Sequence, residues 1–331
     1  MDNSVLNATK NRFGVVGLVS ELDLKREDCV VKVKSDDGSV SEVPSERIRG
    51  KISLEIGANQ VKTFDVYASK TTSKGKEHQQ WAMYEAMMNW NPRIHGNPNE
   101  EPTKVILNGS VGINDYLGQD GKAHSILKWN INSANTKVSP DEPLGCSLNF
   151  TGFVRKIVPE IRNEEETGRL NVELLGVDTK GAVYPVGIIV PEELVEGFTD
   201  FYEAGKTGNF DIDVVMVHVG DKKAKKKAFG KAASTNINTG FDIEERVMRG
   251  GNEPIEEPED EDENGNLIDN GWLNPEAIKA AIKERDKKLA ELKANPPKKA
   301  TETVSAPAKK TSKFNKKPDM NSTDDDDDFG F

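Results

Sequence analysis

The segment Phe13-Gly-Val-Val-Gly-Leu-Val-Ser20 begins the pattern that decides the fold class. It is an apolar run interrupted by glycine, and apolar or alternating runs of about four to eight residues are typical of β-strands. Four further runs of this kind follow in the first 143 residues, at 29–34, 52–56, 61–68 and 104–111. The pattern therefore predicts a mainly β fold.

A single helical pattern interrupts these runs. Within residues 76–90, Trp81, Tyr84 and Met88 recur at helical spacing, and Asn91-Pro92 supplies a stop signal. We expect a helix between the fourth and fifth runs. Its aromatic side chains are expected on a buried face, with stacking against a ligand as the alternative.

The same order recurs in the second part of the chain. Strand patterns occupy residues 148–161, 170–177, 183–190 and 210–219, and a helical pattern at 191–202 follows the third of them. Local sequence also recurs: Gly14-Val-Val-Gly17 resembles Gly152-Phe-Val-Arg155, and Asn130-Ile-Asn-Ser133 resembles Asn236-Ile-Asn-Thr239. We infer an internal duplication.

The order strand, strand, strand, helix, strand, strand is that of the OB-fold, a small Greek-key barrel that binds oligonucleotides on strands 2 and 3 and in two flanking loops. The prediction is two tandem OB-fold-like barrels, residues 1–143 and 144–250, each with one inter-strand helix. A pair of β barrels or sandwiches without a ligand is the alternative.

The composition changes after Gly250. Residues 251–273 form a Pro-broken acidic linker, and Asn274-Pro275 then supplies an N-cap and a first-turn proline for an amphipathic helix over 274–294. A Pro- and Lys-rich linker follows at 295–323, and an acidic tail ends the chain at 324–331. The helix is expected to dock on a barrel, and the acidic C-terminal region is expected to be disordered.

Charge and residue content exclude several classes of protein. The net charge is −11, of which −7 falls in residues 251–331, so a basic groove in the β region is still possible. Two distant cysteines and four scattered histidines offer no zinc or disulfide pattern, and no apolar run spans a membrane. Ala204-Gly-Lys-Thr207 lacks the glycine of a P-loop. We expect a cytoplasmic protein, in the host cytoplasm if viral, that is no enzyme and has no cofactor or metal.

The richest basic patch lies in the predicted loop between the last two strands of the second block. Single-strand binding needs cations that follow the phosphates and aromatic faces on which bases stack. The loop offers six lysines around one ring: Lys222, Lys223, Lys225, Lys226, Lys227, Lys231 and Phe229. The matching loop of the first block is weaker, with Tyr116, Lys122 and His124. The alternative for both loops is a solvated hairpin tip.

The strand at 61–68 supplies further candidates. Its alternation places Phe64 and Val66 on one face and Tyr67 on the other, so Tyr67 is a candidate stacking ring, although a structural role is as plausible. The remaining candidates are mostly lysines around the first block: Lys62, Lys70, Lys74, Lys76, Lys128 and Trp129. Trp129 is in phase with Leu127 and Ile131, so it is either core or a stacking ring.

The last eight residues differ from a simple solubilising tail. They place two phenylalanine rings and a free carboxylate behind an acidic run: Asp324, Asp325, Asp326, Asp327, Asp328, Phe329, Gly330 and Phe331. This ending, behind OB-like blocks and a Pro/Lys linker, resembles the single-stranded DNA-binding proteins of bacterial and bacteriophage replication. Two blocks in one chain depart from the single barrel of the bacterial tetramer.

The resemblance implies a function in replication, recombination and repair. The implied protein protects single-stranded DNA without sequence specificity, recruits polymerase, helicase-primase or recombinase through its tail, and lets the tail compete with DNA for the groove. An extended chain spaces residues about 3.4 Å apart, close to the phosphate spacing of one strand, which agrees with such competition. The alternatives are a viral structural or assembly protein and a strand-annealing factor.

Overall fold

The computed structural model describes residues 6–35, 37–118, 120–162, 164–219, 241–259 and 269–294. The chain divides into two compact units, Met1–Asn295 and Pro296–Phe331. The second unit, and with it the predicted tail, lies outside the described residues. The architecture below is that of the first unit.

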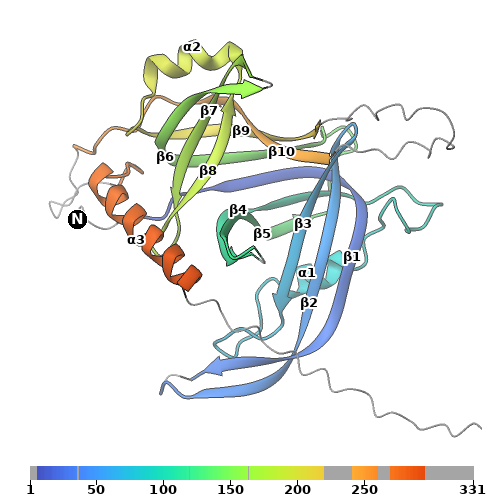
Figure 1. Cartoon of the computed structure of the whole chain (residues 1–331). Helices are drawn as coiled ribbons and strands as arrows, with labels where there is room; N and C mark the ends of the chain where they lie inside the picture. Colours follow the sequence, from blue (N-terminus) through green and yellow to red (C-terminus); the bar gives the residue numbers. More distant parts are fainter. Residues whose placement is uncertain are drawn as a thin grey trace, which may run out of the picture. The chain divides into compact units, whose positions relative to one another are not determined.

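The first block contains five antiparallel strands and one short helix (Figure 1). The elements are β1 (Arg12–Lys34), β2 (Val40–Gly57), β3 (Gln60–Ser69), α1 (Trp81–Met87), β4 (Lys104–Leu117) and β5 (Ala123–Asn135). Backbone pairing gives the strand order β3-β2-β1-β4-β5. Trp81, Tyr84 and Met87 of α1 are buried, so the helix has the buried aromatic face that its spacing predicts.

The second block closes into a five-stranded barrel. Its elements are β6 (Gly145–Arg162), β7 (Glu165–Val177), β8 (Val183–Val190), α2 (Glu192–Phe201), β9 (Thr207–Val219) and β10 (Phe241–Gly251). The ring runs β6-β7-β8-β10-β9 and returns to β6, with one parallel bridge between Val247 of β10 and Ile189 of β8. This is the strand order of an OB barrel.

The prediction of two closed barrels is shown for only one of them. In the described part of the first block, no backbone pairing joins β3 to β5. Side chains fill this seam instead: Phe64 of β3 and Trp129 of β5 meet edge to face with ring centroids 6.2 Å apart. The first block therefore has an OB-like order of strands, but β3 and β5 meet through side-chain packing and not through backbone pairing.

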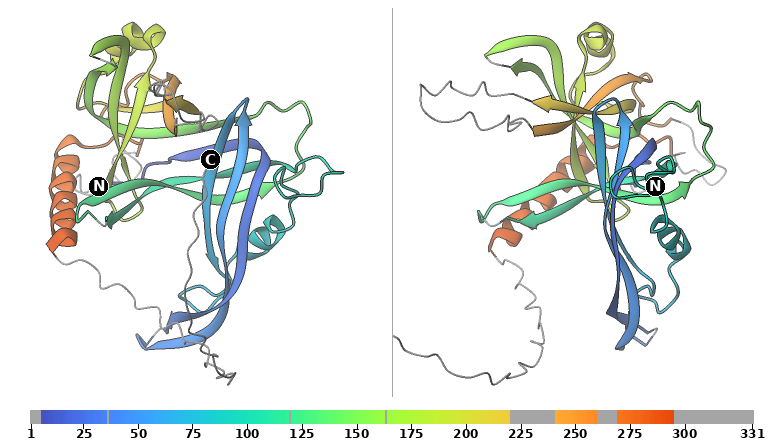
Figure 2. Two further views of the ribbon diagram at one scale, coloured as in Figure 1. Left: turned by 45° about the vertical axis from the view of Figure 1, so that its right-hand side comes forward. Right: turned by 90° about the vertical axis from the view of Figure 1, so that its right-hand side faces the viewer.

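The first strand is longer than its sequence suggests. Residues 13–20 and 29–34 were expected as separate strands, but β1 runs unbroken from Arg12 to Lys34 and forms an extended hairpin with β2 (Figure 2). The apolar alternation of residues 21–28 is limited to Leu22 and Leu24, which pack against the core, and the last four residues, 25–28, are all charged. They are held by pairing with β2 and by ion pairs such as Arg26 with Glu46.

Backbone pairing joins the two blocks into one ten-stranded sheet. Residues Arg12–Val16 of β1 pair with Gly145–Asn149 of β6 on one edge, while their other edge pairs with β4. A partly buried ion pair adds a second connection, from the buried Lys62 of β3 to Glu244 of β10. The outer surfaces of both blocks therefore belong to one continuous framework.

The helix α3 (Pro275–Ala294) packs on the second barrel and reaches the first block. Asn274 caps it, accepting hydrogen bonds from the backbone N–H of Glu276 at 2.8 Å and of Ala277 at 3.2 Å. Ile278 is buried in a cluster with Phe153 and Leu175 of the barrel. Figure 2 shows α3 beside the ends of β4 and β5. Within the described ranges, no helix has the length and apolar character needed to cross a bilayer.

Candidate nucleic-acid interface

The outer face of β2 and β3 carries one large exposed ring. Along β3, Phe64, Val66 and Ala68 point into the core, so the alternate residues point outward. Tyr67 is among these outward residues, and 65% of its surface is exposed. A tyrosine so placed presents a flat aromatic face to solvent on the strands that OB proteins use for oligonucleotides.

Four cations surround this ring in neighbouring strand positions. Arg49 lies directly opposite Tyr67 across the β2–β3 pair, and Lys25 of β1 lies opposite Arg49. Arg47 and Lys51 stand two positions either side of Arg49 on the same face of β2. We call Lys25, Arg47, Arg49, Lys51 and Tyr67 the Tyr67 face. It joins a stacking surface to side chains that can contact phosphates.

Acidic side chains on this face hold the guanidinium groups in place. Glu27 accepts ion pairs from Arg47 at 3.0 Å and from Arg49 at 2.8 Å. The hydrogen bond from Arg49, followed by that from Arg47, holds the pKa of Glu27 below its usual value despite some desolvation. The hydrogen bond to Glu27, and next the one to Tyr67, raises the pKa of Arg47. The cluster is therefore pre-ordered, with Arg49 half exposed.

Gly50 allows the strands to meet at this point. It adopts φ of +143°, and a Cβ atom there would clash with the carbonyl oxygen of Asp23. Any other residue would push β1 and β2 apart. The glycine thus fixes the approach of Lys25 to Arg49.

The loop between β4 and β5 is the second element that OB proteins use, and it carries the predicted Tyr116, Lys122 and His124. Tyr116 stacks on His124 with ring centroids 5.5 Å apart and planes inclined by 24°. His124 Nε2 lies 3.0 Å from the carboxylate of Asp120, and this contact lowers the pKa of Asp120. Lys122 and Lys128 are exposed. This hairpin offers one partly exposed ring, which is already covered on one side by a histidine.

Lys62 and Trp129 do not lie where a ligand could reach them. Lys62 is 4% exposed, and its ammonium group pairs with Glu244 inside the joint between the blocks. Trp129 is 8% exposed and packs edge to face on Phe13, with centroids 5.1 Å apart. Both positions are in phase with the core residues of their strands, which is the physical reason for their burial.

The three lysines after β3 have different surroundings. Lys70 Nζ lies 3.4 Å from Glu46, so its charge is already shared. Lys74 and Lys76 are exposed in the turns that follow β3. These two remain accessible to a phosphate, on the segment that leaves the Tyr67 strand.

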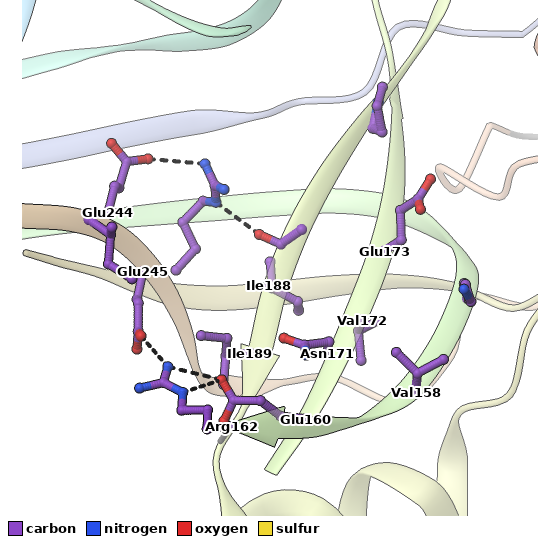
Figure 3. Close-up of a pocket in the computed structure, with 15 residues that line it drawn as sticks. Val158, Glu160, Arg162, Asn171, Val172, Glu173, Ile188, Ile189, Glu244 and Glu245 are labelled. Carbon is purple, nitrogen blue, oxygen red and sulfur yellow. Dashed lines mark hydrogen bonds and ion pairs between the residues drawn. The ribbon is translucent and has the colours of Figure 1, made fainter. Parts of the chain in front are cut away.

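The second barrel has a groove of about 600 Å³ on its outer face, without an aromatic ring among the described residues that line it. Figure 3 shows Glu160 and Glu245 facing Arg162 at one end of this groove. Glu160 and Glu245 are 6% and 5% exposed, and Arg162 and Arg169 bridge them. The cations of this groove are therefore largely neutralised, and it offers no stacking surface.

The richest lysine patch, Lys222 to Lys231, lies outside the described residues, as do Asn236 to Thr239 and the tail Asp324 to Phe331. The strands that flank the patch are described. Val219 of β9 pairs with Phe241 of β10, and the backbone N–H of Met216 donates to Gln60 of β3 at 3.3 Å. The strands β9 and β10, which flank the patch in sequence, both contact the first residues of the Tyr67 strand, at Gln60 and Lys62.

Sequence reasoning placed Tyr67 on the outward face of its strand, where the structure has it, but did not single out the basic residues beside it. The signal was present, because Arg47, Arg49 and Lys51 alternate with Ile48 and Gly50, which places three cations on one face of a strand. Lys25 had no such signal, since its position opposite Arg49 follows from the hairpin register. No cluster of His, Cys, Asp and Glu in the described ranges could hold a metal ion.

A family model matches residues 10–295, a range that includes every described strand and helix. The chain belongs to the YorF family. No curated protein is significantly similar to it.

Two solved structures of the single-stranded DNA-binding protein from Thermus aquaticus are weakly similar to the structure of this YorF-family chain. The wild-type protein is 9% identical with a TM-score of 0.41, covering 78% of this chain and 98% of that one. A deletion mutant is 11% identical with a TM-score of 0.40, covering 76% and 99%. A replication protein A heterotrimer bound to single-stranded DNA is 9% identical with a TM-score of 0.18, covering 87% and 71%. Similarity at this level carries no argument, so the function must be argued from the site.

Proposed function

We propose that this chain binds single-stranded DNA without sequence specificity, and that the Tyr67 face is the principal contact surface. The carrying observation is the exposed ring of Tyr67 directly opposite Arg49, on the β2–β3 face that OB proteins use. Stacking of a base on an aromatic ring contributes about 1–3 kcal/mol and tolerates every base. Arg47, Arg49 and Lys51 supply the charges for neighbouring phosphates.

The charge balance of the face sets the expected affinity. Glu27 already shares the charges of Arg47 and Arg49, and Asp23 pairs with Lys25 at 3.4 Å, so binding must compete with or rearrange these ion pairs. We therefore expect moderate affinity that falls steeply with salt. Each neutralised phosphate of a single strand contributes about 0.7 to the slope of log K against log salt concentration.

The experiment is a titration of fluorescein-labelled oligo-dT by anisotropy at two salt concentrations. An external label reports binding directly, since Trp81 and Trp129 are 2% and 8% exposed and the Tyr67 face contains no tryptophan. We expect a complex that weakens as salt rises. A chain that binds no oligonucleotide even at low salt would overturn the proposal and favour a viral structural or assembly role.

The C-terminal tail extends the proposal to partner proteins. Its aspartates mimic the charge density of a strand, and an acidic segment with the ring of Phe331 suits a basic pocket with an apolar floor on a polymerase, helicase-primase or recombinase. Deleting Asp324 to Phe331 is expected to tighten binding of oligo-dT in the same titration. Equal affinities of the intact and truncated chains would contradict competition between tail and DNA.

A further inference from the structure

A polar cleft lies between the two blocks, away from the Tyr67 face. Its volume is about 680 Å³. One wall is the outward surface of β4 and β5, a second is the segment 8–12 that leads into β1, and the third is the turn between β7 and β8, at 177–184. Both blocks therefore contribute residues to it.

The first wall is built from polar residues in cross-strand register. Arg12 of β1 lies opposite Ser110 of β4, which lies opposite Asn130 of β5. The next row places Gly14 opposite Asn108, and Asn108 opposite Ser133. Cross-strand neighbours of this kind lie about 4.5–5.5 Å apart, so the amide and hydroxyl groups form a compact array of hydrogen-bonding groups.

The cleft carries two cations whose charges are not shared. Lys10 and Arg12 are exposed, and neither lies within ion-pair distance of a carboxylate in the described part of the chain. The one acidic residue in the lining, Asp178, accepts hydrogen bonds from the backbone N–H groups of Lys180 and Ala182, at 2.8 and 2.9 Å. Its carboxylate therefore closes its own turn, and the cleft presents positive charge.

Buried hydrogen bonds hold the walls together. Asn11, 3% exposed, donates to Thr9 Oγ1 and to the hydroxyl of Tyr184, each at 2.7 Å, and accepts from the backbone N–H of Thr151 at 2.9 Å. The Tyr184 hydroxyl donates in turn to the carbonyl of Val111 at 3.3 Å. One asparagine thus joins β1, β6, β8 and, through Tyr184, β4. The cleft is a fixed shape rather than a gap between independent parts.

We propose that this cleft binds a second stretch of the single strand, with Lys10 and Arg12 on its phosphates and the asparagine amides on its sugar and phosphate oxygens, which carry no sequence information. The inference rests on the proposed function. The chemistry differs from that of the Tyr67 face, because the one aromatic ring in the lining, Tyr184, is 2% exposed and cannot stack on a base. Contacts here add salt dependence and hydrogen bonds, whereas contacts at Tyr67 add stacking.

The test compares the salt slope of three full-length chains with a long labelled oligo-dT. The double variant Lys10→Ala/Arg12→Ala is expected to lower the slope by about 1.4, or about 0.7 for each phosphate contact that is lost. The control Lys287→Ala/Lys293→Ala removes the same charge from exposed positions of α3 and is expected to leave the slope unchanged. Urea unfolding of each variant checks that the fold is intact.

The outcomes separate the inference from the function on which it rests. If the Lys10/Arg12 variant keeps the wild-type slope while Tyr67→Ala weakens binding, the cleft proposal is overturned and the Tyr67 face stands. If the control lowers the slope as much as the Lys10/Arg12 variant, the effect is one of net charge and the cleft proposal is again overturned. If the wild-type chain binds no oligonucleotide, both proposals fail.

Discussion

The ammonium nitrogen of Lys62 lies 4.1 Å from the centroid of the Trp129 ring, across the seam between β3 and β5. Glu244 of the second barrel completes this contact by pairing with the same ammonium group. A cation over an indole ring is attracted by the negative face of the ring, more strongly when both are away from water. One buried lysine therefore seals the open side of the first block and joins it to the second.

Removing Glu244 should be costly because it leaves Lys62 charged and buried. We expect Glu244→Ala to lower the free energy of unfolding by about 3 kcal/mol, the lower end of the range for breaking a buried ion pair. The control is Asp23→Ala, which breaks the exposed pair with Lys25 and should cost less than about 1 kcal/mol. Urea denaturation measures both. Equal losses in the two variants would contradict a structural role for Lys62.

Glu160 makes stability depend on pH. Burial alone would raise its pKa, but hydrogen bonds from Thr167 and Arg162 and the charge of Arg169 outweigh burial and hold the pKa below its usual value of 4.5. A carboxyl with a lower pKa in the folded state stabilises the fold above its unfolded pKa, and this contribution disappears as the pH falls through the folded pKa.

We therefore expect the unfolding free energy to decline as the pH falls below about 4.5, and to decline less steeply in Glu160→Gln. Glu276→Gln serves as the control, since Glu276 pairs with Lys279 on an exposed helix surface where solvent screens the charge. Denaturant unfolding at several pH values gives the slopes. A Glu160→Gln slope as steep as that of the wild-type chain would count against this network.

Arg285 connects α3 to the β4–β5 hairpin. Its guanidinium makes two hydrogen bonds to Asp115, at 2.8 and 2.9 Å, and a third to Ser125 at 2.9 Å. Arg285→Lys cannot keep the two-pronged contact. We expect it to cost about 1–3 kcal/mol of stability, with Asp115→Asn giving a non-additive double mutant. Lys287→Ala on the exposed side of α3 is the control and should have no measurable effect on stability. If the losses of stability in Arg285→Lys and Asp115→Asn simply add in the double mutant, the contact between the two residues is unimportant.

Much of the architecture could be predicted from the sequence because local pattern and burial agree. In the second block the strands at 148–161, 170–177 and 183–190 lie within β6, β7 and β8, where apolar alternation follows the core. Residues 21–28 were not predicted as strand because only Leu22 and Leu24 alternate there, and the charged residues 25–28 are ordered by pairing with β2. Closure of a barrel also depends on backbone pairing between strands that are far apart in sequence. Local pattern therefore could not predict that β8 and β10 pair whereas β3 and β5 do not.

The candidate site was predictable only in part. The alternation around Phe64 identified Tyr67 as an outward ring, and the same alternation should have placed Lys62 in the core. A lysine in phase with apolar neighbours is a candidate for a buried ion pair, but its partner Glu244 is 182 positions away and cannot be found by spacing. The polar cleft is a product of both blocks, so neither block alone indicates it.

The most direct test of the central claim is the affinity of Tyr67→Ala for labelled oligo-dT, measured beside Tyr67→Phe. The account predicts that Tyr67→Ala loses about 1–3 kcal/mol of binding free energy, that Tyr67→Phe stays close to the wild-type chain, and that both unfold at the wild-type urea concentration because the ring is exposed. Wild-type affinity in Tyr67→Ala would contradict the claim that this ring is the stacking surface.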